Sequence, residues 1–220
     1  MLTRLAPAWL MALSVVLPAQ ATPATYPCYQ AVTAPVVDGN VAGDPAWSNV
    51  PAVTGFSKLG GGYTVAKQTV LQACWDDQAL YVAMVCEEPD AAQLKPQVRD
   101  GGPFWEEDGA EIFVQPGADK PVSQLGVTAG GAKGGFEGFP DFTKLQAGAS
   151  LGKDSYSLEA RIPFEVLRAT PKVGESITRP ATLADIDLPA LGQRMQETIE
   201  RQQADDPKAR ETGKQHLLWG

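Results

Sequence analysis

A tryptophan and four acidic residues lie within seven consecutive residues of this chain, from Trp105 to Glu111. Glu106, Glu107 and Asp108 stand between those two ends. The flat face of an indole suits the C–H groups of a sugar ring, and a carboxylate accepts hydrogen bonds from two neighbouring hydroxyls. This stretch is therefore a candidate carbohydrate site. On residue types alone, a partly packed tryptophan beside a solvated acidic loop is the commoner arrangement.

The flanking sequence predicts how these side chains are presented. An Ile-Phe-Val run favours a pleated, packed surface, so residues 110–115 are predicted to form a strand. The Gly-Pro pair at 102–103 breaks the chain just upstream, which places Trp105 on a loop or at the entrance of the strand. From there Trp105 and Glu111, just inside the strand, can face the same cavity.

The clearest structural signal is a pair of apolar strands, predicted over residues 69–75 and 80–86 with a hairpin loop over 76–79. Both strands are apolar on both faces, which indicates a position inside a two-layer sandwich. Trp75, Tyr81 and Met84 are therefore assigned to the core. The expected cross-strand partners are Trp75 with Leu80, Cys74 with Tyr81, and Thr69 with Cys86.

Turn-forming residues are frequent elsewhere, with 22 glycines and 18 prolines, which suits an all-β chain of many short strands. About 200 mature residues are enough for one core, and one domain is expected. The other predicted elements are a short strand into a turn at 36–39, a helical turn at 44–47 that buries Trp47, a weak strand at 124–128, a glycine-rich surface loop at 130–138, a half-exposed strand at 155–162 and a helical turn at 163–167.

The first 21 residues predict a secretory signal peptide. Arg4 supplies the positive start, an apolar run follows over 5–17, and Ala-Gln-Ala at 19–21 is a small-x-small cleavage site. Removal takes away one arginine and no acid, so the formal charge changes from −8 to −9. Such an acidic chain is a poor candidate for nucleic acid or an anionic membrane. We expect a secreted or periplasmic protein without membrane insertion.

Three cysteines remain after export, and an exported compartment permits disulfides. The predicted hairpin places Cys74 and Cys86 on opposite faces, so Cys28 would be one end of any bridge. Three separate buried thiols are the alternative.

Four pieces of the sequence occur in an order that resembles family 9 carbohydrate-binding modules. They are APVVDGN with Trp47 behind it, TVLQACWDDQALYVAMVCEEP, WEEDGAEIFVQP and YSLEARIPFEVL, which span roughly residues 33–174. The resemblance implies an antiparallel two-sheet β-sandwich that binds the ends of plant-type polysaccharide chains in a slot between two tryptophans. It also suggests structural calcium as a cofactor, and a role in carbohydrate catabolism beside a glycoside hydrolase.

The resemblance assigns individual residues within WEEDGAE without gaps. Trp105 falls on the first slot tryptophan, and Glu111 falls on the carboxylate that holds sugar hydroxyls. Asp108 matches the acid between them, which we expect to support the site without touching the sugar.

Glu106 and Gln124 complete the predicted set of sugar-contacting side chains. The strand that carries Gln124 has a sugar-contacting arginine in the best-known family pattern, and Gly126 stands at that position here. The second slot tryptophan belongs near the end of the family domain, where this chain stops resembling the family. We therefore expect a one-sided site that binds weakly, because one stacking face leaves most of the ligand in water.

The predicted domain boundaries follow from this comparison. Residues 22–179 form the sandwich domain, and 180–220 form a divergent tail with strong helix formers at 193–203. Trp219 could replace the second tryptophan, although packing is the more frequent role for a tryptophan at a chain end.

Catalysis is not expected. The single histidine, His216, lies almost at the end of the chain, and the paired acids Glu106 and Glu111 are poorly placed to act across one glycosidic bond. One alternative is a haem b electron-transfer domain of the same sandwich superfamily, with Met84 and His216 as axial ligands. Another is an exported scaffold that has lost the sugar slot, which Gly126 favours.

Overall fold

The computed structural model describes most of the chain between residues 25 and 174. The described residues are 25–56, 65–117, 120, 122–135, 141–171 and 173–174, together with the backbone of 57–58 and 217–218. The predicted signal peptide at 1–21 and the predicted helix at 193–203 lie outside these ranges. Within them, no helix is long and apolar enough to cross a membrane.

The larger of two main sheets contains the predicted hairpin at its centre. Adjacent strands in this sheet pair in antiparallel fashion, except for one parallel pair at its edge. The predicted register is confirmed, because Trp75 pairs with Leu80 and Thr69 with Cys86. In spatial order the strands are β1 (Tyr29–Gln30), β4 (Thr69–Trp75), β5 (Ala79–Glu87), β10 (Ser155–Pro163) and β9 (Gln146–Leu151), with β2 (Ala52–Val53) also on β4.

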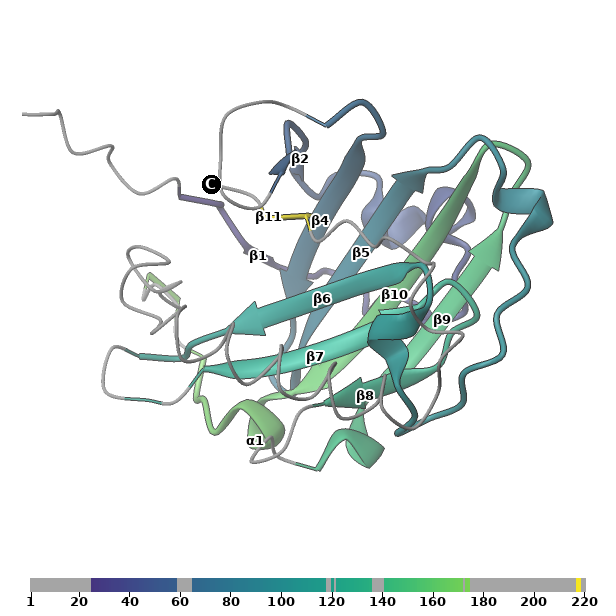
Figure 1. The fold of residues 1–220 in the computed structure, drawn as a ribbon. Coiled ribbons are helices and arrows are strands. Elements are labelled where there is room, and N and C mark those ends of the chain that lie inside the picture. The colour runs from purple at the N-terminus through teal and green to yellow at the C-terminus, as the bar shows by residue number, and fades with distance from the viewer. Residues whose placement is uncertain are drawn as a thin grey trace, which may run out of the picture.

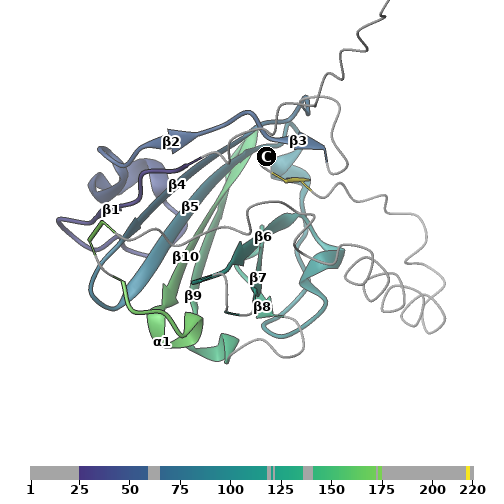
Figure 2. The same ribbon diagram turned by 90° about the vertical axis from the view of Figure 1, so that its left-hand side faces the viewer.

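The smaller sheet lies across one face of the larger one, in front of β5, β10 and β9 in Figure 1. Figure 2, turned by 90°, shows the two sheets as separate layers. The strands are β6 (Gly109–Val114), β7 (Ser123–Thr128) and β8 (Lys133–Gly135), all antiparallel. A two-residue ladder joins β3 (Ser57–Lys58) to β11 (Leu217–Leu218). The predicted all-β sandwich is therefore confirmed, and so is the strand after Trp105.

Apolar side chains from the facing sides of the two sheets form the main core. Leu125 and Ile162 are completely buried in it, and Met84 is 8% exposed. A void of about 10 Å³ remains between the sheets beside Met84, Ala110 and Val127. That volume admits about one water molecule, so it is no ligand cavity.

The opposite face of the larger sheet carries a third layer made of two short helical turns, η1 (Val41–Gly43) and η2 (Pro45–Trp47). They lie behind the larger sheet in Figure 1. Asp44 caps η2 by accepting a hydrogen bond from the N–H of Ala46, and Trp47 is 3% exposed. The predicted helical turn and its buried tryptophan are thus confirmed.

The buried carboxylate of Glu159 ties this layer to the sheet. It accepts hydrogen bonds from the backbone N–H groups of Asp38 (3.1 Å) and Gly39 (2.7 Å) and from Trp47 Nε1 (2.6 Å). Gly39 has φ +87°, and a Cβ there would lie 2.3 Å from the carbonyl carbon of Ala149, so only glycine fits.

Two sequence predictions are corrected at this point. The segment 36–39 is not a strand, because the N–H groups of Asp38 and Gly39 bind Glu159 instead of a neighbouring strand. Strand β10 is not half-exposed, because it lies between β5 and β9 and most of its residues are buried. Its polar residue Glu159 is accommodated by hydrogen bonding, which alternation alone does not reveal.

The remaining helical turns are short, with three or four residues each. Arg168 adopts a left-handed conformation (φ 51°) and ends α1, which confirms the predicted turn at 163–167. The predicted loop at 130–138 is wrong in part, since β8 forms within it. These turns are α1 (Phe164–Leu167), η3 (Ala91–Gln93), η4 (Phe104–Glu106) and η5 (Phe142–Lys144).

All three cysteines are free thiols. Cys74 packs with Trp47 in the outer layer, whereas Cys86 packs in the main core, so their predicted placement on opposite faces is confirmed. Cys28 is partly buried against the main core. Burial raises the pKa of Cys28 to about 11 and that of Cys74 to about 12, which keeps both protonated at neutral pH.

Candidate functional site

The stretch with the tryptophan and the acids begins in η4, a single helical turn directly after Pro103. Phe104 is 4% exposed, whereas Trp105 is partly buried. Their ring centroids lie 5.1 Å apart with an interplanar angle of 77°, which is a T-shaped contact. We call Phe104 and Trp105 the aromatic pair. Trp105 is therefore held by an intrachain contact and does not stand on an unsupported loop.

Phe104 lies against the backbone of two strands of the smaller sheet. Gly126 of β7 and Gly134 of β8 are cross-strand partners, and we call them the glycine pair. A Cβ added to Gly126 would lie 1.9 Å from Cδ2 of Phe104, and one added to Gly134 would lie 2.3 Å from its Cδ1. The ring thus occupies the space that side chains at both positions would fill.

Glu111 and Gln124 lie on the same face of the smaller sheet, and we call them the polar pair. Glu111 stands opposite Gly126 in the β6–β7 register, and directly opposite residues share a face. Gln124 Nε2 donates a hydrogen bond of 2.6 Å to Glu111 Oε2. Since Leu125 and Val127 point into the core, this shared face is the outer one. The polar pair therefore lies beside the ring of Phe104.

Glu107 holds the loop that carries the aromatic pair to the chain segment before it. Its Oε1 accepts hydrogen bonds from the backbone N–H of Val98, at 2.7 Å, and of Gln97. Its Oε2 is buried without a hydrogen-bond partner among the described residues. The carbonyl of Asp108 accepts a hydrogen bond from Ala129 N–H at 2.7 Å, which joins the loop to the end of β7.

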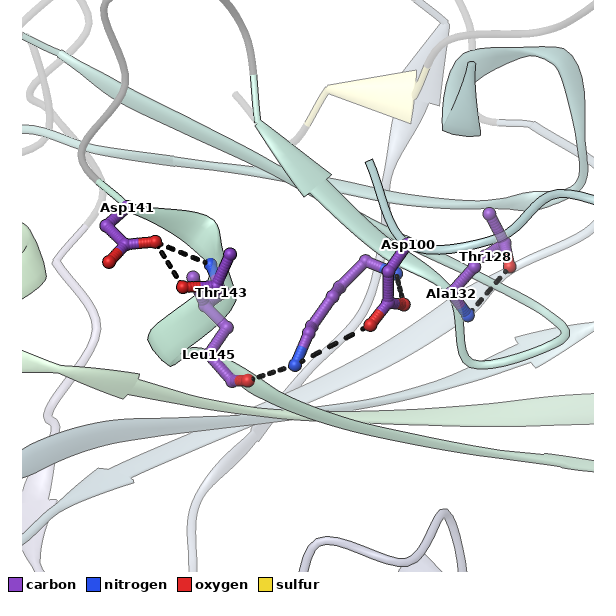
Figure 3. Close-up of polar contacts among 7 residues, drawn as sticks. Asp100, Thr128, Ala132, Asp141, Thr143 and Leu145 are labelled. Carbon is purple, nitrogen blue, oxygen red and sulfur yellow. Dashed lines mark hydrogen bonds and ion pairs between the residues drawn. The ribbon is translucent and has the colours of Figure 1, made fainter. Parts of the chain in front are cut away.

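A second anchor joins the chain before η4 to β8. The backbone N–H of Lys133 donates to Asp100 Oδ1 at 3.1 Å, and Gly101 N–H donates to the Lys133 carbonyl at 2.9 Å. Lys133 Nζ donates to the Leu145 carbonyl at 2.5 Å and lies 3.8 Å from Asp100 Oδ2. Figure 3 shows Asp100 and Leu145 on either side of the side-chain amino group that joins them.

The turns next to this anchor are closed by their own side chains, as Figure 3 also shows. Thr128 Oγ1 accepts a hydrogen bond from the N–H of Ala132 at 3.2 Å within the β7–β8 turn. Asp141 accepts from the N–H and the hydroxyl of Thr143 at the start of η5. The hydrogen bond from the Thr143 hydroxyl is the main reason why the pKa of Asp141 is lowered. The turns on both sides of the anchor are therefore closed by hydrogen bonds of their own.

Residues 37–206 match the model of a family described as carbohydrate family 9 binding domain-like. The chain belongs to this family. The family 9 domain is also similar to two solved structures of a family 9 carbohydrate binding module from Caldicellulosiruptor kristjanssonii, one in complex with glucose and one with cellotriose. Each is 25% identical with a TM-score of 0.50, and the match covers 67% of this chain and 72% or 71% of the other. No functionally curated protein matches the chain.

The structure joins some of the predicted site residues directly and leaves others apart. The polar pair is hydrogen-bonded, and Trp105 is connected to it through Phe104 and the glycine pair. Glu106, at the end of η4, and Asp108, just before β6, have exposed side chains.

Sequence reasoning missed Phe104, Gly134 and the anchoring role of Glu107. A glycine inside a strand often marks the close approach of another group, so the glycine pair was an available signal. Glu107 could not be distinguished by type from the acids beside it.

Two other sequence hypotheses concern bound groups. Met84, the methionine of the haem hypothesis, packs in the main core, and His216 lies outside the described residues. Among the described residues, no cluster of three or more His, Cys, Asp or Glu side chains is arranged to hold a metal ion. Structural calcium remains a prediction.

Proposed function

We propose that this family 9 domain is an exported, non-catalytic protein that binds a poly- or oligosaccharide at the outer face of its smaller sheet. A sugar ring stacks on Trp105, and its hydroxyls form hydrogen bonds with Glu111 and Gln124. The protein acts in carbohydrate catabolism, beside a glycoside hydrolase that cleaves the chain it holds. The predicted signal peptide at 1–21 supports export.

The observation that carries this proposal is the position of the polar pair next to the aromatic pair. A carboxylate accepts hydrogen bonds, and an amide both donates and accepts them, so together they match sugar hydroxyls, which do both. The adjoining aromatic surface matches the apolar face of the sugar ring. The bound glucose and cellotriose in the similar Caldicellulosiruptor structures support the same ligand class.

The same geometry argues for binding without catalysis. Cleavage of a glycoside needs two carboxyl groups on either side of the scissile bond. Glu111 is hydrogen-bonded to Gln124 in β6, and Glu106 is an exposed residue at the end of η4. Glu107 uses its carboxylate to hold the backbone of its own loop.

The test is a binding screen of the chain without residues 1–21 against glucose, cellotriose and soluble polysaccharides. Isothermal titration and affinity electrophoresis measure binding, each with and without a chelator to detect calcium dependence. We expect Trp105→Ala to abolish retention with little change in melting temperature. Tyr29→Ala is the control, because Tyr29 is 60% exposed in the other sheet. Unchanged retention of Trp105→Ala, or its failure to fold, would contradict the assignment.

One observation favours the scaffold as a second candidate function. Phe104 fills the outer-face space at Gly126, where the resemblance places a sugar-contacting arginine. A chain that retains the fold but binds no saccharide in the same screen, with normal melting behaviour, would support the scaffold.

A further inference from the structure

The burial of Phe104 is not explained by packing in the core between the two sheets. It is as buried as a core residue, at 4% exposed, yet it lies on the outer face of the smaller sheet and not between the sheets. Its Cδ2–Cε2 edge meets Gly126 and its Cδ1–Cε1 edge meets Gly134. One ring therefore covers two paired strands and takes the place of two side chains.

The contact with the glycine pair limits where the Phe104 ring can lie. Glycine weakens a strand, because it loses more chain entropy on folding and packs no side chain of its own. Two glycines at paired positions therefore indicate that the space above them is needed by another group. Any side chain at either position would displace the ring, since the added Cβ would lie within 2.3 Å of it.

The same ring has two neighbours that belong to the proposed sugar site. Trp105 meets it edge-on at 5.1 Å and 77°. Glu111 stands opposite Gly126 on the same face, so the base of its side chain lies next to the position that the ring covers. Phe104 thus contacts the stacking indole and lies over the strand position opposite the carboxylate.

We propose that Phe104 is the positioning residue of this site, and that it fixes the tilt of the Trp105 indole and its separation from Glu111. The proposal rests on the proposed function. Phe104 is only 4% exposed, so we expect it not to touch the sugar itself. The glycine pair acts through Phe104, as the base on which its ring is held.

The test compares two phenylalanines of equal burial. Phe104→Leu keeps an apolar side chain but removes the ring that contacts Trp105 and covers Gly126. Phe164→Leu is the matched control, because Phe164 is also 4% exposed but lies in α1. Gly134→Ala leaves Phe104 intact and pushes its ring from below. Affinity for cellotriose is measured by titration, and the melting temperature is measured in parallel.

A second readout follows the indole directly. The sequence has five tryptophans, and one of them, Trp9, lies in the predicted signal peptide, so the mature chain has four. Labelling with 5-fluorotryptophan gives one fluorine resonance for each, and Trp105→Ala assigns the resonance of Trp105. We expect Phe104→Leu and Gly134→Ala to shift this resonance and to weaken cellotriose binding at least tenfold. Phe164→Leu should lower the melting temperature similarly but leave the resonance and the affinity unchanged within twofold.

The outcomes separate the two proposals. If the wild type binds and Trp105→Ala does not, but Phe104→Leu binds normally with an unmoved resonance, the positioning role is overturned and the proposed function stands. If the wild type binds none of the saccharides in the screen, the proposed function falls and takes the positioning role with it. If Phe104→Leu fails to fold, Gly134→Ala decides by the same two measurements.

Discussion

Each of the two sheets has a glutamate and a tryptophan at its outer face, and the two pairs differ in burial. Glu159 and Trp47 on the larger sheet are 1% and 3% exposed, and the indole N–H donates directly to the carboxylate. Glu111 and Trp105 at the smaller sheet are both partly buried. The same two residue types therefore have different surroundings at the two sheets.

The covering elements explain the difference. Over the larger sheet, the chain from Asp38 to Trp47 folds back as a loop and two helical turns, and its N–H groups bind Glu159. Over the smaller sheet, the ring of Phe104 covers the glycine pair, while Glu111 is hydrogen-bonded to a side-chain amide. Glu159 is thus held by two backbone N–H groups and a buried indole, whereas Glu111 accepts a hydrogen bond from a side-chain amide, which under the proposed function gives way to a sugar hydroxyl.

The largest effect is expected from replacing the buried carboxylate. Glu159→Leu leaves three N–H donors without an acceptor, and each stranded buried donor costs about 1–3 kcal/mol. We therefore expect the free energy of unfolding, measured by urea denaturation, to fall by about 3 kcal/mol or more. Glu165→Leu is the control, because its side chain is 65% exposed. A loss of less than about 1 kcal/mol would mean that the outer layer does not depend on Glu159.

The second prediction concerns the other glutamate, with the opposite balance of effects. Glu111→Gln should weaken saccharide binding by about 1–3 kcal/mol, the usual range for a hydrogen bond to a charged group. The free energy of unfolding should change little, since Glu111 is only partly buried. Titration measures the first quantity and urea denaturation the second, with Glu165→Gln as the control. A variant that binds normally but unfolds easily would place Glu111 in the same structural class as Glu159.

The same contrast explains how far the sequence could be interpreted. The β4–β5 hairpin was predicted in correct register, because its apolar residues and its turn leave one pairing that buries both strands. The helical turn at Trp47 followed from aspartate before proline. Such features are local, and their residue types are sufficient to specify them.

Contacts between distant segments could not be predicted in this way. The carboxylate of Glu159 meets N–H groups about 120 residues earlier in the chain, and nothing in the alternation of β10 indicates that partner. Likewise, the sequence did not single out Phe104, because the adjacent Trp105 is the residue type expected to stack on a sugar. Its role depends on two glycines from β7 and β8 that only the fold brings together.

The smallest effect on stability is expected from Asp76, a carboxylate in the loop between β4 and β5, and it depends on pH. Burial alone would raise the pKa of Asp76, but hydrogen bonds from the Gln78 N–H, the Tyr81 hydroxyl and the Ala79 N–H outweigh it and lower the pKa. A lowered pKa in the folded state means that Asp76 stabilises the fold above its unfolded pKa. That contribution is lost as the pH falls through the folded pKa.

Asp76→Asn should therefore be less stable than the wild type at pH 6, and the difference should shrink at pH 3. Urea denaturation at the two pH values measures it, with the exposed neighbour Asp77→Asn as the control. A difference that stays constant with pH would mean that the hydrogen bonds to Asp76 do not depend on its charge. Because Asp76 lies in the β4–β5 loop and not in β6 or β7, saccharide affinity should be the same in both variants. A loss of affinity in Asp76→Asn would show that the outer side of the larger sheet also contributes to binding.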